Sequence, residues 1–87
     1  MRVTVEFFGI PRARAGVPQT LANGSTLGEV FLDLAQRFPA LGEECIQGGS
    51  LKAGYTANLQ GEKFVTAPTT LLNEGDLILL LSIDAGG

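Results

Sequence analysis

The chain has no histidine, no tryptophan and a single cysteine, Cys45. Without an imidazole, a serine or cysteine nucleophile cannot be activated in the usual Ser-His or Cys-His pair. One cysteine forms no internal disulfide, and no zinc ligand set can be assembled from these residues. No cationic residue lies close to Cys45 in sequence to lower its pKa, which favours a quiet, partly buried thiol over a sulfur relay. We therefore expect no metal site and no catalytic apparatus of the chain's own.

Charge and long apolar runs are also scarce. The net charge is −3, and the basic residues are scattered rather than clustered: Arg2, Arg12, Arg14, Arg37, Lys52 and Lys63. A nucleic acid partner needs a clustered basic surface, so none is expected. No segment approaches the ~20 apolar residues of a membrane span, and the N-terminus lacks the features of a signal peptide. We expect one small cytoplasmic domain with no membrane partner.

Period-two alternation marks the strands. Val3, Val5 and Phe7 alternate with other residues at the start of the chain, which predicts a strand with one buried face. Residues 11–16 break this pattern, and residues 17–21 can form a second strand. Because Pro18 lacks an N–H, this strand should lie at a sheet edge or begin late. Residues 55–59 and 63–65 read as a hairpin around a turn at 60–62. Residues 77–81 are apolar on both faces, which indicates a central strand.

One strong helix is predicted after the second strand. Thr26 followed by Glu29 has the spacing of a capping box, which begins a helix. Apolar residues at helical spacing then form a stripe that we interpret as a core face rather than a partner groove, namely Leu27, Val30, Phe31, Leu34, Ala35 and Phe38. Pro39 is expected to stop the helix. Residues 40–54 are rich in glycine and are interpreted as a loop with room for one helical turn.

The order of these elements predicts an α+β fold of the β-grasp (ubiquitin-like) type. In it a mixed sheet of four to five strands wraps around one main helix, with the first and last strands side by side at the centre. The domain is expected to span residues 1–82, and residues 83–87 form a projecting flexible tail that ends in Gly86-Gly87.

The tail is the candidate chemical group. Termini tolerate glycine for trivial reasons, but here Gly-Gly follows a central strand and the tail has no lysine or arginine. A main-chain carboxylate becomes electrophilic once ATP has adenylated it. Two residues without Cβ atoms let such an end thread a narrow channel. The working group is therefore expected at Gly87, with Gly86 and Ala85 threading a partner's active site.

Five segments together resemble the MoaD and ThiS family of sulfur carriers, closest to MoaD, the small subunit of molybdopterin synthase. They are Val5-Glu6-Phe7-Phe8-Gly9 with Arg12 and Ala15-Gly16 shortly after, Thr26 to Val30, Arg37 to Leu41, Leu72 to Asp76, and Ala85-Gly86-Gly87. The chain departs from many MoaD sequences in having Ser82-Ile83 and Asp84 where a Pro-Pro pair precedes the final residues. Its hairpin, Asn58 to Gly61, matches the family's Val-Asn-Gly only loosely.

The resemblance implies a sulfur-carrying cycle. A MoeB- or ThiF-like enzyme would adenylate Gly87 with ATP, a persulfide would convert it to a thiocarboxylate, and a MoaE-like large subunit would take the sulfur into molybdopterin. The chain itself would bind no cofactor. Three alternatives stay open: a carrier for cysteine, thiamine thiazole or tRNA thiolation, a ubiquitin-like modifier joined to lysines, and a binding module with an inert tail.

The sheet face turned away from the helix is the expected docking surface. If Ile78 and Leu80 point inward, Leu77, Leu79 and Leu81 point outward and form an apolar patch, which Phe8 extends. The alternative is that residues 40–54 cover this face. Arg12 matches a basic position of the family and would pair with partner carboxylates, or would simply be a solvated arginine.

Overall fold

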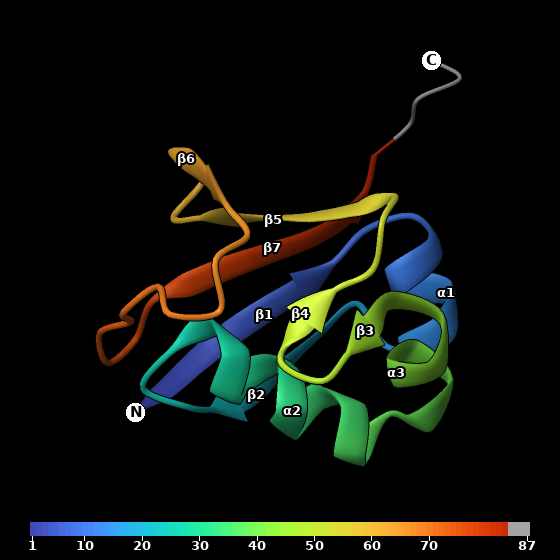
Figure 1. The fold of residues 1–87 in the computed structure, drawn as a ribbon, viewed down its shortest axis with the longest axis horizontal. Helices are drawn as coiled ribbons and strands as arrows, with labels where there is room; N and C mark the ends of the chain where they lie inside the picture. The colour runs from blue at the N-terminus through green and yellow to red at the C-terminus, as the bar shows by residue number, and fades with distance from the viewer. Residues whose placement is uncertain (84–87) are drawn as a thin grey trace.

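A five-stranded sheet with its helices on one face forms the core of the computed structural model, which describes residues 1–83 (Figure 1). The elements in chain order are β1 (Arg2–Phe7), α1 (Ile10–Ala15), β2 (Gln19–Asn23), α2 (Leu27–Arg37), α3 (Pro39–Cys45), β3 (Ile46–Gln47), β4 (Ser50–Leu51), β5 (Tyr55–Leu59), β6 (Lys63–Val65) and β7 (Leu77–Ser82). Strands β3 and β4 pair with each other as a small separate sheet.

The strand order is β2-β1-β7-β5-β6. Strand β1 runs parallel to β7, whereas the β1–β2, β5–β6 and β5–β7 pairs are antiparallel. The predicted mixed sheet, with its first and last strands side by side, is therefore confirmed. Strand β2 lies at an edge and begins at Gln19, directly after Pro18, as the missing N–H predicted. It runs to Asn23, two residues beyond the predicted end.

The core lies between this sheet and α2. The inward side chains of β1, Val3, Val5 and Phe7, and those of β7, Ile78 and Leu80, are almost completely buried. They face the buried stripe of α2, which consists of Leu27, Val30, Phe31 and Leu34. The strand alternation and the helix period therefore predicted the same core, and its burial is what stabilises the domain.

The N-terminus of α2 is closed by side chains and by the β6–β7 connection. The Thr26 hydroxyl accepts a hydrogen bond from Glu29 N–H at 3.2 Å, as the capping box predicted. The Glu29 carboxylate bonds the N–H of Ser25 at 2.7 Å, one residue before the position that a capping box uses. The N–H groups of Leu27 and Gly28 donate to carbonyls of the segment between β6 and β7. The first-turn donors of α2 are thus occupied within the domain.

Two further helices correct the sequence interpretation. Residues 11–16 do not merely interrupt the strands, because residues 10–15 form α1, which begins with Pro11 in its first turn and ends at a left-handed Gly16 with φ 79°. Residues 39–45 form α3, a seven-residue helix that begins at Pro39. Proline stops the preceding helix but also suits the first turn of the next one, since no partner is needed for its missing N–H.

Strand β2 is an edge whose main chain is partly covered. Arg37 on α2 donates to the Leu21 carbonyl at 2.6 Å and to the Thr20 hydroxyl at 3.2 Å. The Asp33 carboxylate accepts from Asn23 N–H at 3.0 Å and pairs with Arg37 at 3.2 Å. These contacts occupy groups to which another strand would otherwise bond. Within residues 1–83 no helix is long and apolar enough to cross a membrane.

Candidate functional site

The C-terminal segment leaves the sheet at the end of β7. Ser82 is still paired with Tyr55 of β5, and the Ile83 N–H donates to the Gly54 carbonyl at 2.7 Å. Gly87, Gly86 and Ala85, the predicted working residues, lie outside the described residues. The described structure therefore fixes where the segment departs, beside the turn that begins β5.

Gly9 contacts the same point from the other side. It follows β1 with φ 63° and ψ −132°, a backbone conformation that side chains with a Cβ rarely adopt. A Cβ built at Gly9 would lie 2.8 Å from the Ser82 Oγ. Phe8 N–H donates to the Leu80 carbonyl at 2.9 Å, which ties this turn to β7. A glycine here lets the start of α1 approach the last residue of β7.

The outer face of the sheet, turned away from α2, carries the predicted leucines. Ile78 and Leu80 are completely buried, whereas Leu77, Leu79 and Leu81 are half-buried on the opposite face. The predicted orientation of β7 is confirmed. The alternative that residues 40–54 cover this face is wrong, because α3, β3 and β4 pack against α2 on the helix side (Figure 1). The Phe8 side chain is 43% exposed, and the alternation of side chains along β1 directs it to this same outer face.

One row of residues crosses the outer face through all five strands. The strand registers place Phe64 opposite Asn58, Asn58 opposite Leu79, Leu79 opposite Glu6, and Glu6 opposite Gln19. Phe64 is 67% exposed. Sequence reasoning missed Glu6, Asn58 and Phe64 because their neighbours depend on register. The only signal available was the alternation within each strand.

Two polar side chains of the row, Asn58 and Glu6, are at least partly buried and have no partner among residues 1–83. Asn58 is 9% exposed, and less than 1 Å² of its Oδ1 atom is accessible. That oxygen accepts no hydrogen bond among the described residues. Glu6 is half-buried and forms no salt bridge within residues 1–83. Two acceptors therefore flank Leu79, one on each side.

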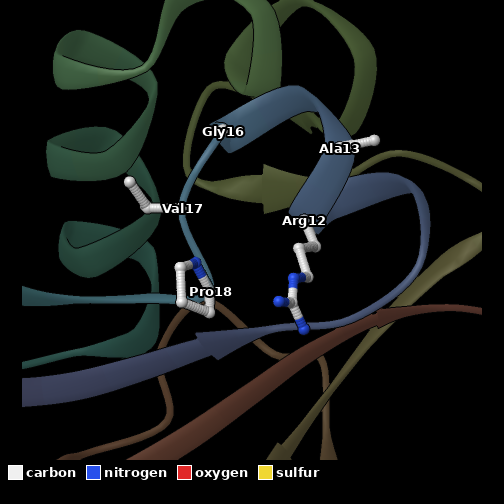
Figure 2. Close-up of a pocket in the computed structure, with 5 residues that line it drawn as sticks. All are labelled: Arg12, Ala13, Gly16, Val17 and Pro18. Atoms are coloured by element: carbon white, nitrogen blue, oxygen red, sulfur yellow. The ribbon is translucent and has the colours of Figure 1, made fainter.

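Arg12 lies on α1 rather than on the sheet face. It lines a shallow pocket of about 300 Å³ together with Ala13, Gly16, Val17 and Pro18, whose positions Figure 2 shows. It forms no salt bridge within the described part of the chain, so its guanidinium is available to a partner or to solvent. Nothing in the described residues places Arg12 in the row around Leu79.

Cys45 is buried at the end of α3. Burial, and then the neighbouring Glu44 carboxylate, raise the pKa of its thiol to about 11. A thiol with this pKa stays protonated near neutral pH, which opposes a sulfur-relay role. No cluster of three or more His, Cys, Asp or Glu side chains that suits a metal ion occurs in residues 1–83.

No protein-family model and no curated protein sequence matches the chain, but solved structures do. The small archaeal modifier protein 1 (SAMP1) of Methanosarcina acetivorans superposes with a TM-score of 0.80 at 26% identity, covering 99% of this chain and 96% of that chain. The sheet topology and this superposition agree. The chain has the β-grasp fold.

Two similar structures come from complexes. A chain of the BexX/CysO complex of Amycolatopsis orientalis matches with a TM-score of 0.80 at 22% identity, covering 98% of this chain and 99% of that one. A chain of the complex between subunits 1 and 2 of molybdopterin-converting factor from Helicobacter pylori matches with a TM-score of 0.68 at 24% identity over the full length of both chains. This fold therefore occurs among proteins that assemble with partner chains.

Proposed function

We propose that this β-grasp chain is a ubiquitin-like sulfur carrier whose working group is the carboxylate of Gly87. The observation that carries the proposal is that Gly86-Gly87 follow the central strand β7 closely in the sequence, and that β7 presents Leu77, Leu79 and Leu81 on the sheet face that no helix covers. An activating enzyme of the MoeB or ThiF type binds that face and adenylates Gly87 with ATP. The terminal sulfur of an enzyme persulfide then displaces AMP, which forms an acyl disulfide. A second thiol attacks this disulfide, so that a new disulfide forms at the thiols and a thiocarboxylate is left on Gly87.

The proposed destination of the sulfur is molybdopterin. In this role a MoaE-like large subunit receives the segment from Ala85 to Gly87 and takes the sulfur from it. The similarity to a chain of the Helicobacter pylori molybdopterin-converting factor complex and the sequence resemblance to MoaD both support this role. A carrier that supplies another sulfur product would use the same carboxylate and would differ only in the acceptor enzyme.

A second candidate is a protein modifier. It is favoured by the similarity to SAMP1 of Methanosarcina acetivorans, whose identity of 26% is slightly higher than the 24% of the molybdopterin-converting factor chain. In that role the adenylated Gly87 ends in an isopeptide bond to a lysine of a target protein. Both candidates share the first step, adenylation of the same carboxylate, and diverge afterwards.

Mass spectrometry of the protein recovered from its own cell tests both candidates. An intact mass in which one oxygen of Gly87 is replaced by sulfur supports the carrier. Gly-Gly remnants on lysines of other proteins support the modifier, and the variant lacking Gly87 serves as the negative control for either product. Loss of molybdopterin in a strain that lacks the chain, restored by the wild type alone, supports molybdopterin as the destination. Neither product in cells that contain an activating enzyme would refute the function.

A further inference from the structure

The outer face holds a polar pair with an apolar residue between its members. Asn58 of β5 and Glu6 of β1 are each directly opposite Leu79 of β7, one on either side. Adjacent strands lie about 4.8 Å apart, so the two backbones are roughly 10 Å apart with Leu79 between them. At this separation the Glu6 and Asn58 side chains can both reach a group that lies over Leu79.

Both polar groups can accept hydrogen bonds, and neither has a donor among residues 1–83. The Glu6 carboxylate is half-buried and has no salt bridge within residues 1–83. Asn58 is more than nine-tenths buried, and its Oδ1 has no hydrogen-bond partner among them. Buried polar atoms in folded proteins nearly always have a partner. An unpaired carbonyl and an unpaired carboxylate on either side of Leu79, on the sheet face that no helix covers, are complementary to a cationic donor.

We propose that Glu6, Leu79 and Asn58 form a receptor for one arginine side chain of the docking partner. The guanidinium lies over Leu79 and donates to the Glu6 carboxylate on one side and to the Asn58 Oδ1 on the other. The identity of the partner, the activating enzyme, rests on the proposed function. The receptor itself rests on the register and burial of these residues.

Arginine fits this site better than lysine. Its guanidinium is planar, weakly hydrated and carries five N–H donors in a fork, so it can cover an apolar side chain and bond two acceptors at once. A lysine ammonium is a compact, strongly hydrated charge that would reach one acceptor. The terminal torsion of asparagine has broad minima, so the Asn58 amide can turn its oxygen toward Leu79 when the donor arrives.

A purely structural role for Asn58 predicts a different behaviour. If the amide stabilised the domain, replacing it with leucine would lower the melting temperature. An unpaired buried amide instead opposes folding, so Asn58→Leu is expected to raise the melting temperature while it weakens partner binding. A residue with a purely structural role would not raise the melting temperature and weaken partner binding when it is replaced.

The test is a double-mutant cycle on binding to the adenylating enzyme from the same cell, measured by calorimetry. Glu6→Gln and Asn58→Leu are each expected to weaken binding by about tenfold. The double variant should be little worse than the poorer single variant, because both residues bond one guanidinium. Glu62→Gln, in the β5–β6 turn, and Gln36→Leu, at an exposed position of α2 on the other side of the sheet, are the matched controls and should bind within about twofold of the wild type.

The outcomes separate this inference from the proposed function. Single variants that bind like the wild type would overturn the receptor, and fully additive effects would exclude a shared arginine. If the adenylating enzyme neither binds nor adenylates the wild-type chain, the proposed function fails. The receptor is then tested separately by nuclear magnetic resonance, with N-acetyl-argininamide as the probe. Shifts of the Asn58 amide and Leu79 methyl signals that Glu6→Gln abolishes support it. Equal shifts with N-acetyl-lysinamide, or none, refute it.

Discussion

Replacing Gly9 with alanine tests how tightly the end of β1 is packed against the end of β7. A non-glycine residue held in a sparsely populated backbone region costs on the order of 1–3 kcal/mol. The new Cβ also lies 2.8 Å from the Ser82 Oγ, so Ser82 must leave its rotamer, at roughly 0.5–1.5 kcal/mol. The total, about 1.5–4.5 kcal/mol, is a large part of the marginal stability of a small domain.

Urea unfolding followed by circular dichroism measures this loss, and two further variants apportion it. Gly48→Ala introduces alanine at φ 61° with nothing within 4 Å of the Cβ, so it reports backbone strain without a contact. Ser82→Ala removes the Oγ, and Gly9→Ala in that background should lose about 1 kcal/mol less than in the wild type. If Gly9→Ala costs the same with and without the Ser82 hydroxyl, the close approach does not contribute and the reasoning is wrong.

Three further perturbations have defined outcomes. Leu81→Glu should weaken binding of the proposed activating enzyme at least about tenfold yet leave the melting temperature nearly unchanged, because the Leu81 side chain points away from the core. Unchanged affinity in calorimetry would contradict docking on the outer face. Arg37→Ala should lower the free energy of unfolding in urea by about 1–2 kcal/mol and promote concentration-dependent association, because it uncovers the β2 edge. Arg14→Ala, at an exposed position, should lower it by under about 0.5 kcal/mol. Equal losses in the two variants would contradict the proposed role of Arg37 in covering β2. Folding raises the pKa of the Cys45 thiol from 9.0 to about 11. The free energy of unfolding should therefore be unaffected by this group below pH 9 and should fall by ~2 kcal/mol as the pH rises to about 11. A Cys45→Ala variant that loses the same stability over this pH range would contradict this.

The sheet could be predicted because its evidence is local. Alternation, a turn that contains glycine and a run of apolar residues are the signals that predicted strands β1, β5, β6 and β7. The main helix α2 is defined by its cap and its period. Each of these signals lies within a few consecutive residues, and the same residues form the buried core. The orientation of Leu77, Leu79 and Leu81 followed from that alternation alone.

The short helices were missed because their evidence is not local. Helix α3 contains Gly42, a poor helix former, which is there because a Cβ would lie 2.9 Å from the Ala35 Cβ on α2. Its stability therefore comes from close packing of two helices, which sequence periodicity does not reveal. Helix α1 has six residues and no periodic stripe, and only Pro11 and Gly16 mark its ends.

The candidate site divides in the same way. Leucines on one face of a strand can be assigned without knowing any neighbour. The isolation of the Asn58 oxygen and its placement beside Leu79 and Glu6 depend on two strand registers, one of them between β1 and β7, which are separated by most of the chain. Register is set by the whole sheet, so no window of the sequence contains it.

The central place of β7 has a consequence for synthesis. Strand β7 is made after every other element described, yet it alone joins β1 and β2 to β5 and β6. During synthesis the β1–β2 and β5–β6 pairs therefore stay unconnected, and the sheet closes only when residues 77–82 have emerged from the ribosome. A chain interrupted before that point cannot close its sheet.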